Sequence, residues 1–220
     1  MHILLLRILG LTGTFIVTFS VLYAALVYRG KHGERFSLFS YFISELGEEG
    51  VSQGARVFNL SLIAAGLCLL PATVLLGFLL DSFFGWLGAT AGIIASLGAS
   101  AVGLFPVNRL EGHVRAALTF FRAGLVMLFA FGAAIVFQPA DRLVLPRGLA
   151  LLNAFGILTY LAFLILLTIR MRQKQADATL GIGPSGPRPR FRWLPTLEWL
   201  VFFSTLAWIG ALSLFINPTP

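Results

Sequence analysis

The residues best suited to chemistry in this sequence are a histidine, a serine and several carboxylates beside apolar segments. His113 could act as a general base, with Glu45 or Glu111 orienting its ring and Ser44 serving as the nucleophile. Because a chain with several serines and acids offers many such sets, a histidine that caps a helix or joins an ion pair is the favoured alternative. We keep both interpretations open, with Ser44, Glu45 and His113 as the candidate catalytic residues.

The sequence gives little support to metal or cofactor chemistry. Its three histidines, His2, His32 and His113, lack the HExxH-type spacing of a zinc site, and Cys68 is its single cysteine. It contains no phosphate-binding P-loop, GxSxG or GxGxxG pattern. We therefore expect no metal and no cofactor.

A second group of polar residues lies within or beside apolar stretches, where a charge is costly. Arg122 is the most unusual, because it lies about 13 Å deeper than His113 in a helix that rises 1.5 Å per residue. We expect it to face the bundle interior and to have a partner, such as Glu198, Asn59 or Asn153. It is either a structural or snorkelling arginine or part of a site for an anionic headgroup. The candidate headgroup-binding residues are Asn59, Asn108, Glu111, Arg115, Arg122 and Glu198.

Apolar segments must position all of these side chains. Of the 220 residues, 58% are hydrophobic and 11% are charged, whereas soluble domains carry about 25% charged residues. Six stretches are long enough to cross the hydrocarbon core, which needs about 20 apolar residues. The sequence predicts an all-α polytopic membrane bundle of six transmembrane helices in a single domain, residues 1–220. The spans are expected at about 8–28, 57–80, 84–105, 114–137, 149–169 and 197–216.

Small residues recur at every fourth position of the third stretch, as Gly88, Gly92, Ser96 and Ser100. Residues of this size and spacing let helices approach closely in lipid. They favour a central packing helix. With the lack of a strong catalytic signature, they also support an alternative function, a noncatalytic subunit or scaffold of a larger membrane complex.

Basic residues concentrate in the first, third and fifth loops, which share one side of a six-span protein. The positive-inside rule places these loops in the cytoplasm and both termini outside. The net charge of +7 then reflects topology and contact with anionic lipid, and no nucleic acid is expected as a partner. The expected partners are membrane lipids and, in the scaffold alternative, other membrane subunits.

Short motifs near the polar residues carry a resemblance to a known family. FISELGEEG at residues 42–50, Asn59, GLFPVN at residues 103–108 and His113 resemble a bacterial and archaeal family of six-span membrane proteins of unknown function. That family is distantly similar to eukaryotic DRAM- and FRAG-type proteins. The positions that match its motifs are Ser44, Glu45, Gly47, Asn59, Pro106 and His113.

This resemblance implies a location in a bacterial inner membrane. It also implies a lipid-handling role, because one eukaryotic branch takes part in remodelling GPI-anchored lipids. Two departures count against a full transfer. The relatives usually have an aspartate where this chain has Val107 and Asn108, and their first loop is usually drawn outside the cytoplasm. We predict an integral membrane protein that binds or remodels lipid through a polar cluster at one membrane face, and we leave open whether it is an enzyme.

Overall fold

The long apolar stretches of the sequence fold into helices, because in lipid every backbone polar group must find its partner within the chain. The computed structural model describes residues 1–179 and 189–217, with side chains up to residue 173 and from residue 189 onward. Within these ranges there is no strand, and six helices are long and apolar enough to cross a bilayer, which confirms the predicted fold class. They are α1 (His2–Val27), α2 (Ala55–Leu80), α3 (Phe83–Leu104), α4 (Leu110–Val136), α5 (Ala150–Thr179) and α6 (Trp193–Phe215).

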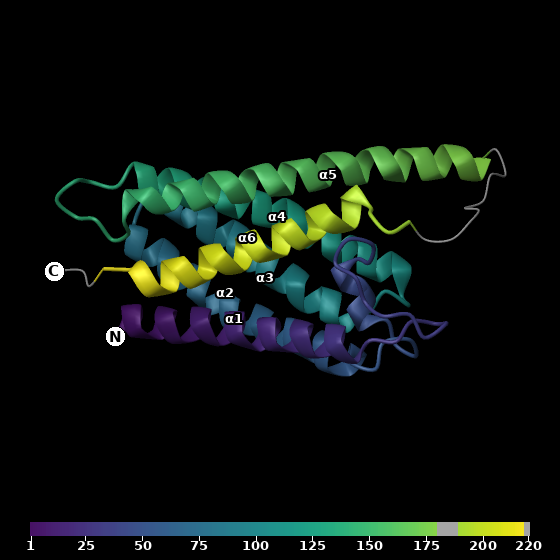
Figure 1. Cartoon of the computed structure of the whole chain (residues 1–220). Helices are drawn as coiled ribbons and strands as arrows, with labels where there is room; N and C mark the ends of the chain where they lie inside the picture. The colour runs from purple at the N-terminus through teal and green to yellow at the C-terminus, as the bar shows by residue number, and fades with distance from the viewer. Residues whose placement is uncertain (180–188, 218–220) are drawn as a thin grey trace.

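Four helices extend by four residues or more beyond the apolar stretches that predicted them: α1, α4, α5 and α6. α4 begins at Leu110 and includes Glu111 and His113, which we expected in the preceding loop. α5 continues to Thr179, well past the expected end near residue 169, and reaches beyond its neighbours (Figure 1). Polar residues such as arginine, lysine and glutamine are good helix formers, so a helix started in lipid propagates into the aqueous phase.

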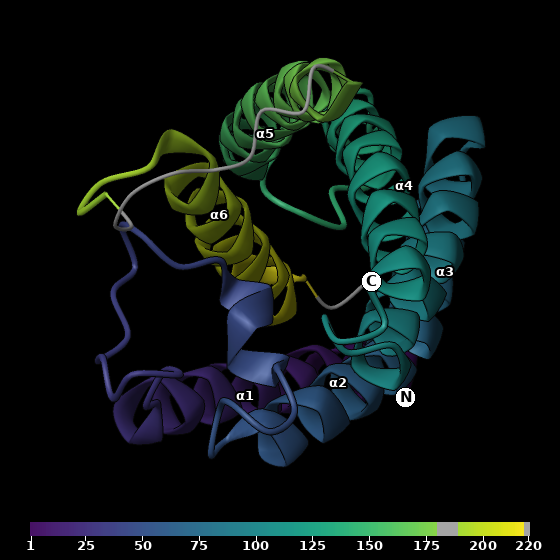
Figure 2. The ribbon, with the colours of Figure 1, turned by 90° about the vertical axis from the view of Figure 1, so that its right-hand side faces the viewer.

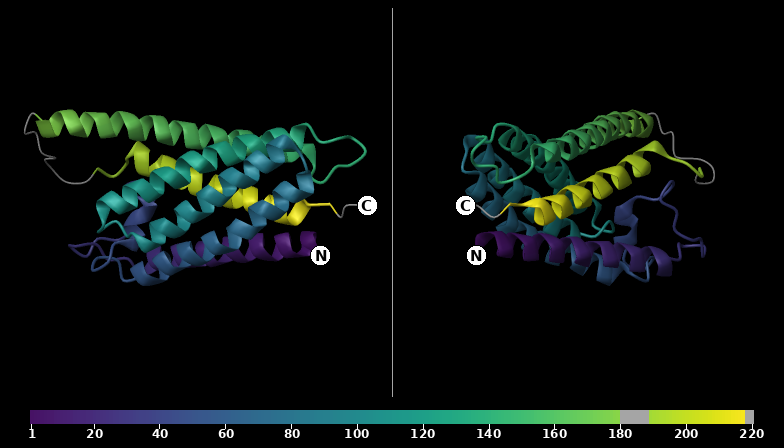
Figure 3. Two further views of the ribbon diagram at one scale, coloured as in Figure 1. Left: turned by 180° about the vertical axis from the view of Figure 1, so that it is seen from behind. Right: turned by 60° about the vertical axis from the view of Figure 1, so that its left-hand side comes forward.

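The six helices form a ring in chain order (Figure 2). Each helix packs against the next in sequence, and α6 closes the ring against α1. The start of α1 and the end of α6 lie at one end of the bundle, as the views in Figures 1 and 3 agree, and we call it the terminal end. The α1–α2 and α3–α4 connections and the start of α6 lie at the opposite end, the cap end. Most of the fifth loop, residues 180–188, lies outside the described residues.

The small residues of α3 pack against helices of the same chain on both of its sides. A methyl group on Gly66 of α2 would lie 2.6 Å from the backbone oxygen of Ser96, and one on Gly98 would lie 2.8 Å from the backbone nitrogen of Phe120 on α4. Such close approach leaves no space for larger side chains. α3 is therefore a packing helix between α2 and α4.

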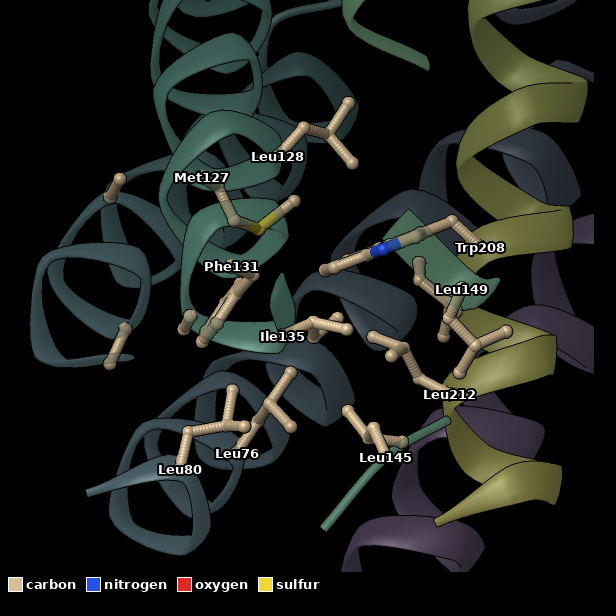
Figure 4. Packing of buried hydrophobic residues seen from close by; sticks show 14 of the residues in the cluster. Leu76, Leu80, Met127, Leu128, Phe131, Ile135, Leu145, Leu149, Trp208 and Leu212 are labelled. Atoms are coloured by element: carbon tan, nitrogen blue, oxygen red, sulfur yellow. The ribbon is translucent and has the colours of Figure 1, made fainter. Parts of the chain in front are cut away.

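Large apolar side chains fill the ring toward the terminal end, where Phe131, Ile135 and Leu145 belong to one cluster with Trp208 and Leu212 of α6 (Figure 4). A buried asparagine is hydrogen-bonded inside this core. Asn153 of α5 donates to the Leu128 carbonyl at 2.8 Å and accepts from the Trp208 indole at 3.0 Å, which joins α4, α5 and α6. This end of the ring is a packed core, and it supports the more open cap end.

Candidate functional site

The ring encloses a partly open cavity of about 130 Å³ toward its cap end. Side chains from α1, α2, α3, α4 and α6 line it, together with the short 3-10 helix η1 (Ile43–Gly47) from the first loop. No residue of α5 is among them. The walls are almost entirely apolar, and Ser44, His113, Glu198 and Thr205 are the polar residues among the lining.

The cavity is elongated along the helix axes and changes in polarity along its length. Glu198 and Ile209 both line it, and their spacing on α6 corresponds to about 16 Å at 1.5 Å per residue. His113 and Glu198 lie in the cap-end turns of their helices, whereas the deeper lining, such as Phe121 and Ile209, is apolar. The deeper hydroxyl of Thr205 is occupied by hydrogen bonds to the Val201 carbonyl and the Tyr160 hydroxyl. The unoccupied polar groups therefore gather at one end.

Glu198 is buried in this cavity, with 7% of its surface exposed. Its Oε2 atom accepts a hydrogen bond of 2.8 Å from the backbone N–H of Ile43, which ties α6 to η1. Among the described residues, no hydrogen bond reaches its Oε1 atom and no Lys or Arg forms an ion pair with it. A buried carboxyl group without a cationic partner is costly, and hydrogen bonding within the chain offsets this only at Oε2.

His113 lies in the first turns of α4 and is 6% exposed. Its Nδ1 atom lies 2.8 Å from the Phe105 carbonyl oxygen, which can only accept, so Nδ1 carries the hydrogen. In the neutral ring this leaves a lone pair on Nε2. The loop before α4 thus fixes the imidazole in one tautomer, and the ring lines the cavity.

The helix η1 lies in the mouth of the ring, between α6 and α2, when the bundle is viewed from its cap end (Figure 2). Its first turn is capped by Glu45, whose Oε1 accepts from the Phe42 N–H at 2.9 Å. Asn59 of α2 donates to the Gly47 carbonyl at 3.1 Å. Anchored in this way, η1 presents Ser44 to the cavity, and no hydrogen bond to another described residue occupies its hydroxyl.

Of the residues predicted from the sequence, the structure brings Ser44, His113 and Glu198 together around one cavity. Glu45 is not among the lining residues, so its capping bond is its described role. Asn59 supports η1 from below. The assignment of Ser44, Glu45 and His113 as catalytic residues stays a prediction.

The other predicted headgroup residues lie outside the cavity. The Asn108 side chain makes two hydrogen bonds to the backbone of Glu49 in the first loop. It accepts from the Glu49 N–H at 2.7 Å and donates to the Glu49 carbonyl at 3.0 Å. Glu111 and Arg115 form an exposed ion pair of 2.6 Å. The Asn108 bonds join the α3–α4 loop to the first loop, whereas the Glu111–Arg115 pair lies within α4.

Arg122 differs from its predicted placement in the bundle interior, because its side chain is exposed on the outside of α4 and makes no hydrogen bond or ion pair with a described residue. The reason lies in helix geometry. The inward stripe of α4 runs through His113, Ala117 and Phe121, and the next residue is turned by about 100° in a helix of 3.6 residues per turn.

The apolar residues that line the cavity were not predicted from the sequence, although the helical spacing of some of them indicated a shared face. Ala117, Phe120 and Phe121 follow His113 at helical spacings of four, seven and eight residues, which marks them as its neighbours on one face. Leu69 and Ile209 carry no comparable signal. Among the described residues, no group of three His, Cys, Asp or Glu side chains could hold a metal ion. What the arrangement offers chemically is an apolar cavity ending in hydrogen-bonding groups.

Comparison with known proteins gives a family and no function. A family model described as "Protein of unknown function (DUF998)" matches residues 12–215, a range that contains η1 and every residue lining the cavity. No curated protein and no solved structure matches the chain.

Proposed function

This chain belongs to the DUF998 family of proteins of unknown function, and we propose that it binds a single-chain amphiphile inside its helix ring. The polar end of the ligand lies beneath η1, beside Ser44, His113 and Glu198. Its hydrocarbon chain follows the apolar walls past Phe121 toward Ile209. The observation that carries this proposal is the cavity itself, which is apolar along its length and holds a buried, half-satisfied carboxyl group at one end.

The size and lining of the cavity support an apolar occupant. Dry cavities of about 150 Å³ in other proteins accept small apolar molecules, and this one is comparable at about 130 Å³, so its occupant has a short alkyl chain. Hydrocarbon is as apolar as leucine, so moving a chain from the bilayer to these walls yields little free energy. Specific binding must therefore come from the polar end, where unoccupied hydrogen-bonding atoms lie.

Two sequence features support a lipid ligand and the orientation of the protein in its membrane. The resemblance to DRAM- and FRAG-type proteins favours a lipid ligand, since one branch of those proteins remodels lipid anchors. The basic residues of the cap-end loops favour a cytoplasmic cap end in a bacterial inner membrane. By contrast, the small residues of α3, which also suited a scaffold, pack within the chain.

Photocrosslinking tests the proposal in the purified protein in lipid nanodiscs. A single-chain lipid with a diazirine in its chain should form adducts on lining residues such as Leu69, Phe121 and Ile209, located by mass spectrometry. Ala117→Phe projects a ring into the cavity and should remove most of these adducts. Ala207→Phe places the same ring on the exposed side of α6 and should leave them unchanged. Adducts confined to outward-facing residues, unaffected by Ala117→Phe, would overturn the proposal.

A further inference from the structure

We infer that the cavity selects a ligand whose polar end donates hydrogen bonds, a hydroxyl or a primary amine, and rejects carboxylate and phosphate ends. This inference rests on the proposed function and specifies the chemical class of its ligand. It also reverses the sequence-based expectation of an anionic headgroup near Arg122.

The first argument is a fixed acceptor at the polar end. His113 spends its Nδ1 hydrogen on the Phe105 carbonyl and presents the Nε2 lone pair to the cavity. Because the protein already holds the imidazole in this role, a donor satisfies it. A ligand that can only accept would leave this lone pair unsatisfied in an apolar site, which is unfavourable.

The second argument is the absence of positive charge at the same place. No Lys or Arg is among the described residues that line the cavity. The nearby cations are held elsewhere by described partners. Arg192 donates to the Ser40 carbonyl and stacks over the Phe42 ring, and Lys31 pairs with Glu48 at 3.3 Å. An anionic end would therefore enter an apolar cavity without a compensating cation, which is costly.

Ser44 makes the selection tolerant within the donor class. Its hydroxyl can rotate to donate a hydrogen bond to the oxygen of an alcohol or to accept one from an amine. The His113 and Ser44 side chains can together accept hydrogen bonds from a small head that has one to three hydrogens to donate. Phospholipids, which carry a phosphate at this position, do not meet this requirement, and so the bulk of a bilayer is excluded.

The test uses four photoreactive probes that share one diazirine-bearing octyl chain and differ in their heads: hydroxyl, amine, carboxylate and phosphate. In the wild-type protein in nanodiscs, the hydroxyl and amine probes should label the cavity at least about tenfold more than the other two, the factor for one hydrogen bond of about 1.4 kcal/mol. Glu198→Gln should reduce amine labelling about tenfold, because it removes the carboxyl group that can ionise against an ammonium head and strengthen this bond. The matched control is Glu111→Gln, an exposed acid outside the cavity, which should change nothing.

The outcomes separate this inference from the proposed function. Equal cavity labelling by all four heads, or a preference for phosphate, overturns the inference and leaves the binding function intact. No cavity adduct with any head overturns the proposed function as well. The four-probe comparison is made on the wild-type protein, so it decides the matter even where Glu198→Gln fails to fold.

Discussion

The Oε2 atom of Glu198 accepts a hydrogen bond of 2.8 Å from the backbone N–H of Ile43, 155 positions away in sequence. This bond joins the wall of the cavity to η1, which lies over its mouth. One carboxyl group therefore lines the cavity and holds η1 in place. We expect occupation of the cavity and order in η1 to be coupled through it.

Removal of the Glu198 carboxyl should loosen η1. In Glu198→Ala the Ile43 N–H loses its acceptor, and we expect its hydrogen exchange to rise about tenfold, matching one net hydrogen bond. Glu198→Gln keeps an acceptor oxygen and should exchange nearly as slowly as wild type. Mass-spectrometric exchange on the peptide covering 42–50 measures this. Equal exchange in the Ala and wild-type proteins would show that the bond does not hold the cap.

Substitution of His113 can separate its two nitrogens. Asparagine places a donor near the position of Nδ1, so His113→Asn should keep the bond to the Phe105 carbonyl while it removes Nε2. His113→Ala loses both and should lower stability by about 1–3 kcal/mol through the unpaired carbonyl. Thermal unfolding measures the loss of the hydrogen bond to the Phe105 carbonyl, and photocrosslinking measures the loss of Nε2. We expect both variants to lose labelling by the hydroxyl probe. Full labelling of His113→Asn would show that Nε2 does not bind the ligand.

The floor of the cavity should set the length of the bound chain. Leu69 and Ile209 also line a second, smaller cavity of about 30 Å³ toward the terminal end, beside Trp208 and Leu212. Leu69→Ala should join the two spaces and shift binding toward longer chains, with a stability loss of about 2–5 kcal/mol. Leu67→Ala, on the exposed side of the same helix, is the matched control. An unchanged preference across probes of increasing chain length would count against this floor.

Membrane orientation can be read from cysteine accessibility, because the chain has one native cysteine, Cys68. In a Cys68→Ala background, His32→Cys marks the cap end and Asp141→Cys marks the loop between α4 and α5 at the terminal end. The positive-inside rule predicts that an impermeant maleimide labels only Asp141→Cys in intact cells. The opposite pattern would place the cap end outside the cytoplasm.

The helices were predictable from sequence because the length of an apolar stretch directly reports a membrane span. Rotation about each helix axis was not, since it depends on which neighbours pack. Phe121 and Arg122 are adjacent in sequence, yet one lines the cavity and the other is exposed outside the bundle. The position of η1 was also beyond prediction, because it depends on the bonds from Ile43 to Glu198 and from Asn59 to Gly47. Neither bond has a local sequence signal.

The account is tested most directly by native mass spectrometry of the protein released from its own membranes. We predict one single-chain amphiphile with a hydroxyl or amine head bound per wild-type chain, retained in Ala207→Phe and lost in Ala117→Phe. An identical profile of bound lipid in all three proteins, or no such ligand in the wild type, would contradict a binding cavity inside the ring.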